Sequence, residues 1–537
     1  MKVQIIKSHA FTISFMLILV LAFVLRFYKL GSNPPSLDWD ENSNAYNAYS
    51  ILKTGRDEHK NFLPVTNQSF DDYKPPLYMY LNIPTVSVFG LTPFAARLPS
   101  AFFGFLTVPL FYFLSKKLLE NQKFVDAKTT ALIAMLLLAI SPWHLQFSRV
   151  GFEANVALFF SVATISGIFY SFKKPKALIL SAIFASLAIY GYHSERVYLP
   201  LLIVALVVIF KKDVAKIPKK IIVGSITVLL LCLMPLALLA PRDAITQRYQ
   251  TITLTSRIDE IKKSIEFQNQ DKKANVPFGN LIHNRRLFTA QTIIDNYLWH
   301  FDLNYLFIKG DDNFRHHVEG MGMLYFWQLP FLIYGIYLCI SRRTKGLLFV
   351  LAWLLIVPIA ASPARPAPHA IRSFAMVIPL TLITSIGLMS FLTLFKKRYK
   401  AIATAFTTLI IVFAFFSYLE SYYIQYPLQH ASDWQYGYNL AAGQTSRMED
   451  KYKAVRIDGS VEQAYIFWLF SKKYDPALYQ KNGSNKQFGK YIFDSAAPKK
   501  TDELFVRNGQ LPPDFKIIKT INLPNGNPAI QIGSLVK

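Results

Sequence analysis

Apolar blocks of membrane-span length recur along the chain and dominate its pattern. A helix that crosses a bilayer needs about 20 apolar residues, and about eleven blocks of that kind follow one another with short breaks. Their approximate centres are Leu19, Leu106, Leu136, Ala163, Ile183, Val204, Leu229, Ile333, Leu354, Leu382 and Ile410. The chain is 52% hydrophobic and 17% charged, whereas soluble domains carry about 25% charged residues. The sequence therefore predicts an all-α polytopic membrane protein.

Basic residues gather in every second break between the predicted spans. The clusters are Lys116, Lys117, Lys123 and Lys128; Lys173, Lys174 and Lys176; Lys211, Lys212, Lys216, Lys219 and Lys220; Arg342, Arg343 and Lys345; and Lys396, Lys397, Arg398 and Lys400. Because an excess of lysine and arginine marks cytoplasmic loops, we expect a multi-pass protein of the plasma (inner) membrane with a cytoplasmic N-terminus. These clusters also account for much of the net charge of +25, so we expect no nucleic acid partner.

The predicted orientation divides the chain into two domains. Residues 1–420 form the transmembrane domain, with external loops at 26–95 and 241–321, and residues 421–537 form a small extracytoplasmic α/β domain. The segment Pro75–Leu91 is apolar, but counting it as a span would place every later lysine cluster outside. We therefore predict a helix that lies along the outer membrane interface.

The tail after residue 420 has a different pattern from the rest of the chain. Short apolar runs alternate with breaks of Gly, Pro, Asn and Lys, which is typical of strands. The runs expected to be strands are Val455–Ile457, Tyr465–Phe470, Tyr491–Phe493 and Phe515–Ile521.

The first external loop carries the densest group of acidic residues. Asp38-Trp39-Asp40-Glu41 places three carboxylates in four residues just beyond the first span. Such a group can supply a general base or a metal ligand at the membrane surface, although it could also be the solvated start of a loop or the N-cap of a helix over Asn44–Leu52. Further along, Lys74-Pro75-Pro76-Leu77 offers a lysine that can hold a phosphate as a point charge. The alternative is a lysine that snorkels to the interface.

Isolated charged residues follow in the later outer breaks. They are Arg97, Arg149, Glu153, His193, Glu195, Arg196, Arg365, His369 and Arg372. Each alone is compatible with an interfacial anchor. Because ionisable groups at membrane depth usually serve a function, together they predict a polar cavity that opens outward.

The order of these motifs resembles the glycosyltransferase-C superfamily. The motifs are Pro34-Pro35, Trp39-Asp40-Glu41, Lys74-Pro75-Pro76-Leu77 and Arg97-Leu98-Pro99-Ser100. The similarity is to bacterial relatives of the dolichyl-phosphate-mannose protein mannosyltransferases and the lipid A aminoarabinose transferases. It covers Arg26 to Phe210, including Tyr192, Arg196 and Pro200, and extends loosely to Arg365–Pro379.

The resemblance implies an inverting transfer of a sugar from a polyprenyl-phosphate donor to a hydroxyl acceptor on the outer face of the membrane. The acceptor would be a protein, a lipid or a glycan. Asp40 would act as the base, Glu41 would position the acceptor or the loop, and Glu153 would be a second carboxylate near the sugar or acceptor. The leaving phosphate would be held by Lys74 and Arg372.

Further residues are assigned on the same resemblance. Arg196 or Arg97 would assist at the phosphate, together with His193, and His369 would bind the phosphate or cap the tenth span. No cofactor is required, although a divalent metal is possible and would then use Asp38 and Asp40.

Two other functions remain open at this stage. A transporter or flippase for a lipid-linked saccharide also lines a cavity with charges, although such proteins often show internal repeats and none is visible here. A surface polysaccharide polymerase or ligase would take a lipid diphosphate donor.

Overall fold

The computed structural model describes residues 2–70, 72–240 and 258–536. The described residues form two compact units. The first, here called the helical unit, lies within Met1–Leu21, Leu106–His144 and Ala157–Phe413. The second, here called the mixed unit, lies within Ala22–Phe105, Leu145–Val156 and Ala414–Lys537. Residues 241–257 of the predicted second external loop lie outside the described residues.

Among the described residues, six helices are long and apolar enough to cross a membrane. They are His9–Phe27, Pro93–Leu119, Glu153–Ser171, Lys219–Leu239, Phe374–Thr393 and Lys397–Gln429. A seventh span results if the pair Ala127–Ala139 and Pro142–Ser148, bent by 56°, is counted as one. All eleven predicted centres lie inside helices. The chain is thus a multi-pass membrane protein, and the number eleven stays a prediction.

Five helices have parts in both units because the chain passes repeatedly from one to the other. They are α1 (Lys2–Phe27), α4 (Pro93–Leu119), α6 (Pro142–Ser148), α7 (Glu153–Ser171) and α19 (Lys397–Glu420). The remaining helices of the helical unit are α5 (Ala127–Ala139), α8 (Ala177–Gly191), α9 (Glu195–Ile209), α10 (Lys211–Val214), α11 (Lys219–Leu239), α13 (Ile258–Lys273), α14 (Gly279–Ile282), α15 (Arg285–Trp299), α16 (Gln328–Arg342), α17 (Lys345–Ala361) and α18 (Val377–Thr393), with the short turns η2 (Asn304–Ile308) and η3 (Phe374–Met376).

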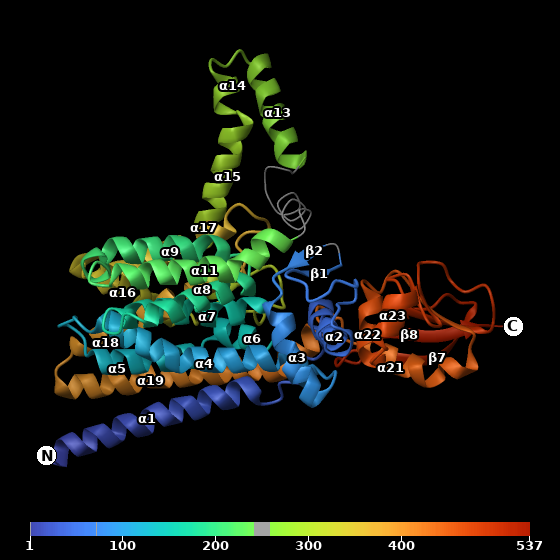
Figure 1. Ribbon diagram of the computed structural model, residues 1–537, viewed down its shortest axis with the longest axis horizontal. Coiled ribbons are helices and arrows are strands. Elements are labelled where there is room, and N and C mark those ends of the chain that lie inside the picture. Colours follow the sequence, from blue (N-terminus) through green and yellow to red (C-terminus); the bar gives the residue numbers. More distant parts are fainter. Residues whose placement is uncertain (1, 71, 241–257, 537) are drawn as a thin grey trace. The chain divides into compact units, whose positions relative to one another are not determined.

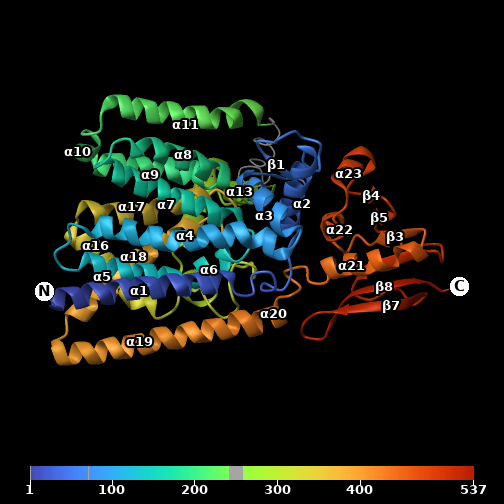
Figure 2. The same cartoon turned by 60° about the horizontal axis from the view of Figure 1, so that its bottom comes forward.

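Helices of the helical unit pack closely where small residues face each other. In Figures 1 and 2, α8 lies beside α11, and α9 packs on α17. In the pair α16 and α18, a Cβ atom on Gly387 would meet the carbonyl oxygen of Phe331 at 1.9 Å, and one on Gly335 would meet that of Ile383 at 2.1 Å. Small residues allow such close backbone contact, which drives helix association in lipid.

The mixed unit combines the first external loop with the C-terminal tail. Its helices are α2 (Trp39–Thr54), α3 (Leu77–Phe89), α20 (Tyr426–Gln429), α21 (Tyr438–Met448), α22 (Ala464–Lys472) and α23 (Pro476–Asn482), with the turns η4 (Ser421–Gln425) and η5 (Glu449–Lys451). The hairpin strands β1 (Asn67–Ser69) and β2 (Asp72–Lys74) are antiparallel. The segment predicted to lie at the interface is indeed a helix, α3.

The tail forms one six-stranded sheet in the order β4-β5-β3-β6-β8-β7, which confirms the predicted C-terminal sheet. The strands are β3 (Ala454–Ile457), β4 (Gln487–Phe488), β5 (Tyr491–Phe493), β6 (Glu503–Asn508), β7 (Phe515–Asn522) and β8 (Pro528–Leu535). Strand β3 runs parallel to β5 and β6, and the other pairs are antiparallel.

One predicted strand is wrong, because Tyr465–Phe470 lies inside helix α22. Every residue of this run is buried, and a short, fully buried apolar run has no periodicity that separates a strand from a helix.

The core of the mixed unit joins α2 to the tail domain. Ala45 and Tyr46 of α2 belong to the same buried cluster as Ile466 and Trp468 of α22. Tyr46 also donates a hydrogen bond to the carbonyl oxygen of Tyr474, at 3.1 Å. The first external loop and the tail, which the predicted boundary at residue 420 assigns to different domains, therefore share one hydrophobic core.

Candidate active site

The acidic group of the first external loop begins helix α2. Asp38 is the N-cap residue, and its carboxylate accepts a hydrogen bond from the backbone N–H of Glu41 at 2.8 Å. In return, the Glu41 carboxylate accepts from the backbone N–H of Asp38 at 3.2 Å. This reciprocal arrangement is a capping box. Asp38 is therefore a helix cap with a buried carboxylate, although the helix begins at Trp39 and not, as predicted, at Asn44.

Glu41 and Arg97 form an ion pair that is fully buried on both sides. The Nε and Nη2 atoms of Arg97 donate to the two carboxylate oxygens of Glu41, at 2.8 and 3.1 Å. The other donors of Arg97 bind the carbonyl oxygens of Leu30, Pro34 and Ser36. A guanidinium has five N–H groups, and all five have partners. The prediction that Arg97 assists at a phosphate therefore does not fit the structure.

A third segment completes the surroundings of Glu41. The backbone N–H of Gly151 donates to Oε1 of Glu41 at 2.8 Å. A Cβ atom at position 151 would lie 3.0 Å from Cγ of Glu41 and 3.3 Å from the hydroxyl oxygen of Tyr78, so the close approach favours glycine. Of the two roles predicted for Glu41, the structure fits the positioning of the loop, because its carboxylate is occupied by four donors.

Asp40 points away from this buried pair and forms an ion pair with Lys74. The Asp40 side chain is 32% exposed and that of Lys74 is 14% exposed, so solvent or a substrate can reach the pair. Register in the hairpin sets Lys74 opposite Asn67, and the Lys74 ammonium also donates to the Ser69 hydroxyl at 3.4 Å. The structure therefore brings together the predicted base and the predicted phosphate-binding lysine.

Glu153 lies close enough to Lys74 and Asp40 to interact with both electrostatically. Burial alone would lower the pKa of Lys74, but the carboxylates of Asp40 and Glu153 together raise it above its ordinary value. An opposite charge nearby favours the charged form of a group. Lys74 is consequently a cation at neutral pH, held between two carboxylates.

Two asparagines connect this cluster, and the sequence reasoning missed both. Nδ2 of Asn44 donates to Oε1 of Glu153 at 3.1 Å, and Nδ2 of Asn67 donates to Oδ1 of Asn44 at 2.9 Å. Asn44 stands four residues after Asp40 on α2, and positions four apart share one face of a helix. That spacing could have identified Asn44, whereas nothing in the sequence pairs it with Asn67.

The other residues predicted to bind the phosphate all belong to the helical unit; they are His193, Arg196, His369 and Arg372. Arg196 donates to the carbonyl oxygen of Ile189 at 3.4 Å, and the His193 ring contacts that of Tyr192. Arg372 donates from Nη1 to the carbonyl oxygens of Arg365 and Pro366, at 3.1 and 3.3 Å.

His369, the last of the predicted residues, lies beside Asp311 in the helical unit, with 4.0 Å between Nδ1 and a carboxylate oxygen. Burial lowers the pKa of His369 well below its ordinary value, and the nearby Arg372 and His316 lower it further. Both effects favour the neutral form of the His369 imidazole, and its predicted role at a phosphate stays a prediction.

Comparisons with known proteins agree with this architecture. Residues 16–246 match the family model described as dolichyl-phosphate-mannose-protein mannosyltransferase. No protein among the curated sequences matches the chain.

Solved structures with the same fold include ArnT from Cupriavidus metallidurans, at 10% sequence identity. In the apo state its TM-score is 0.55, and the match covers 96% of this chain and 97% of that chain. Bound to undecaprenyl phosphate, the same protein gives a TM-score of 0.54 with the same coverage. The apo oligosaccharyltransferase of Archaeoglobus fulgidus matches at 13% identity with a TM-score of 0.50, over 91% of this chain and 64% of that chain.

Proposed function

We propose that this chain is a membrane glycosyltransferase of the glycosyltransferase-C superfamily, as the family model and the fold of ArnT suggest. In this proposal it transfers a sugar from a polyprenyl-phosphate carrier to a hydroxyl acceptor on the extracytoplasmic face, with inversion at the anomeric carbon. The family description names a dolichyl-phosphate sugar, and ArnT has been crystallised with undecaprenyl phosphate. Both support a lipid monophosphate donor. The observation that carries the proposal is the partly exposed Asp40–Lys74 pair, which interacts electrostatically with Glu153.

The reaction needs a base and a cation close to each other. Asp40 removes the proton from the acceptor hydroxyl while the hydroxyl oxygen attacks the anomeric carbon of the donor sugar. The bond from that carbon to the phosphate oxygen breaks, and the lipid phosphate leaves with the electron pair. Lys74 stabilises the negative charge that develops on the leaving group. An ammonium has three N–H donors, so Lys74 can bind a phosphate oxygen and Asp40 at the same time.

Other residues have supporting roles in the proposal. Glu153, fixed by Asn44, is a second carboxylate that can accept a hydrogen bond from a sugar or acceptor hydroxyl. Glu41 and Arg97 are positioning residues, because they fix the start of α2 and so the direction of the Asp40 side chain. No metal enters these steps, since Asp38 is occupied in the helix cap.

The decisive experiment follows lipid phosphate release by purified protein. The protein in detergent is incubated with polyprenyl-phosphate-linked sugars and with membrane or cell-wall acceptor fractions. We expect one donor to yield free polyprenyl phosphate and a glycosylated acceptor, and Asp40→Asn to lower turnover by about 100-fold or more.

A matched control is Asp514→Asn, an exposed carboxylate of the same unit, which should keep full turnover. Normal turnover in Asp40→Asn would remove Asp40 from the mechanism. No release of lipid phosphate in detergent, together with translocation of the intact donor by the protein reconstituted in liposomes, would contradict the transfer reaction and indicate a transporter.

A further inference from the structure

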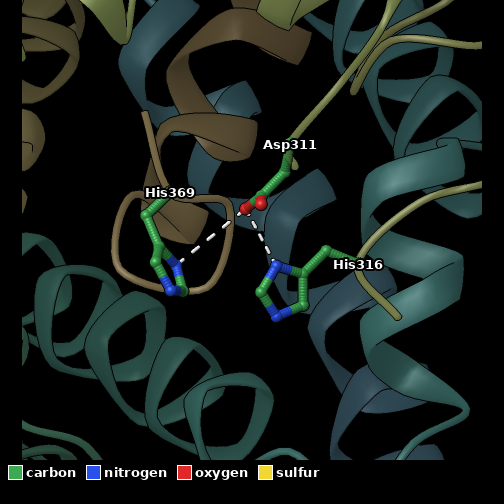
Figure 3. Close-up of side chains that lie close together, drawn as sticks. All are labelled: Asp311, His316 and His369. Atoms are coloured by element: carbon green, nitrogen blue, oxygen red, sulfur yellow. Dashed lines mark hydrogen bonds and ion pairs between the residues drawn. The ribbon is translucent and has the colours of Figure 1, made fainter. Parts of the chain in front are cut away.

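Two histidines and an aspartate meet in the helical unit, apart from the residues of the proposed reaction. Nδ1 of His316 lies 2.8 Å and Nδ1 of His369 lies 4.0 Å from the same carboxylate oxygen of Asp311. One candidate ligand atom from each residue lies within 4.8 Å of the other two. Figure 3 shows both imidazole rings turned toward the carboxylate. Among the described residues, this is the one group of three His, Cys, Asp or Glu side chains close enough to hold a metal ion.

The spacing of these atoms suits a small divalent ion. Zn²⁺ binds histidine nitrogen at about 2.0–2.1 Å in tetrahedral geometry, which separates neighbouring ligand atoms by about 3.3 Å. The observed distances of 2.8 and 4.0 Å lie on either side of that value. A shift of under an ångström at each ring would therefore place three ligands around one ion, which would replace the hydrogen bond between His316 and Asp311.

A second observation points to a missing ligand. Nδ1 of His369 is buried and has no hydrogen-bond partner, although a buried polar atom normally has one. The backbone N–H of His369 donates to Nε2 of His300 at 3.3 Å, so the backbone is held while the ring nitrogen lacks a partner. A metal ion between the three side chains would supply that partner.

The loop around Asp311 is built to hold the carboxylate in place. Asp311 accepts hydrogen bonds from the backbone N–H groups of Asn313 at 2.9 Å and Ala370 at 2.6 Å. Gly310 has a φ of +78°, and a Cβ atom there would lie 2.7 Å from the His317 ring. Partners that orient a metal ligand are a regular feature of metal sites.

We propose that Asp311, His316 and His369 bind one divalent transition-metal ion of the zinc type. Two histidines and a carboxylate are a set that holds Zn²⁺ with a fourth position left for water. The ion joins the loop between η2 and α16 to the segment between α17 and η3, which also carries Arg372. The site uses no residue of the Asp40 cluster, and binding is measured without donor or acceptor, so its failure leaves the proposed transfer reaction intact.

The test uses the full chain in detergent without a histidine tag. After treatment with EDTA, Zn²⁺ is titrated against a chromogenic chelator, and Co²⁺ is added to a second sample. We expect one Zn²⁺ per chain, a rise in melting temperature on adding Zn²⁺, and the visible absorption of four-coordinate Co²⁺. Asp311→Asn and His369→Gln should each weaken Zn²⁺ binding by about 100-fold or more, since even partners behind the ligands contribute 10- to 100-fold.

The matched control is His430→Gln, which removes another histidine that pairs with an aspartate, Asp433 at 3.0 Å, and it should bind Zn²⁺ normally. If the variants do not fold, the Co²⁺ spectrum and the Zn²⁺-dependent melting temperature of the unchanged protein still decide the question. No Zn²⁺ bound, or equal binding by wild type and His369→Gln, would overturn the proposal. Asp311 and the two histidines would then only link the two loops through hydrogen bonds and ion pairs.

Discussion

Replacing Arg97 tests whether the buried pair with Glu41 holds the active-site loop. In Arg97→Met, the Glu41 carboxylate keeps only the backbone donors of Asp38 and Gly151. Removing one partner of a buried ion pair costs about 3–5 kcal/mol. The carbonyl oxygens of Leu30, Pro34 and Ser36 also lose their donor, so we expect the free energy of unfolding to fall by at least that amount.

The size of the effect in other variants follows from the number of donors. Arg97→Lys keeps the charge, but three N–H groups cannot replace five in a fixed fork, so an intermediate loss is expected. Glu41→Gln removes the charge of the partner. The double variant Glu41→Gln/Arg97→Met should be less destabilised than the sum of the single changes, because neither charge is then left alone.

The assay is a denaturant titration in detergent followed by tryptophan fluorescence. Trp434 lies 5.8 Å from the Arg97 guanidinium and reports on this part of the mixed unit. Turnover should fall in parallel, since Asp40 is adjacent to Glu41. If the losses in the single variants add within about 0.5 kcal/mol in the double variant, the two residues act independently, and the account of Glu41 as an anchor is refuted.

Four further predictions concern the same unit. Gly151→Ala should lower the free energy of unfolding by about 1–3 kcal/mol through crowding against Glu41, while Gly443→Ala, with no atom within 4 Å of the added Cβ, should not; equal melting temperatures would contradict this. Lys74→Ala should raise KM for the lipid donor more than KM for the acceptor, and equal effects would exclude a phosphate role. Because the pKa of Lys74 is raised in the folded protein, its charge is fully present below the ordinary lysine pKa of about 10.4 and is lost only above it. Donor affinity should thus be constant from about pH 7 to 9, and a decline owing to Lys74 in that range would contradict the electrostatics. Asn44→Ala leaves Glu153 and Asn67 without a shared partner, so a loss of about 1–3 kcal/mol is expected, and an unchanged unfolding midpoint would show that the network carries no stability.

The apolar blocks along the chain predicted where its long helices lie. Span length and lysine clustering are properties of local sequence, because a bilayer imposes one thickness and one charge bias on every helix. Because span length can be recognised in the local sequence, all eleven predicted centres lie in helices. The resemblance implied that Asp40 and Lys74 act on one substrate, and the structure places the two side chains in contact.

Tertiary structure decided which of the two adjacent carboxylates, Asp40 or Glu41, is accessible to a substrate. Successive residues of an α-helix point about 100° apart, so Asp40 faces Lys74 while Glu41 faces the buried Arg97. That Arg97 is structural could not be seen in the sequence, because its partners are carbonyl oxygens of a loop about sixty residues away in the chain. The grouping of Asp311, His316 and His369 likewise depends on two distant segments returning to one place. Local patterns fix the helices, whereas contacts between distant residues fix what their side chains can do.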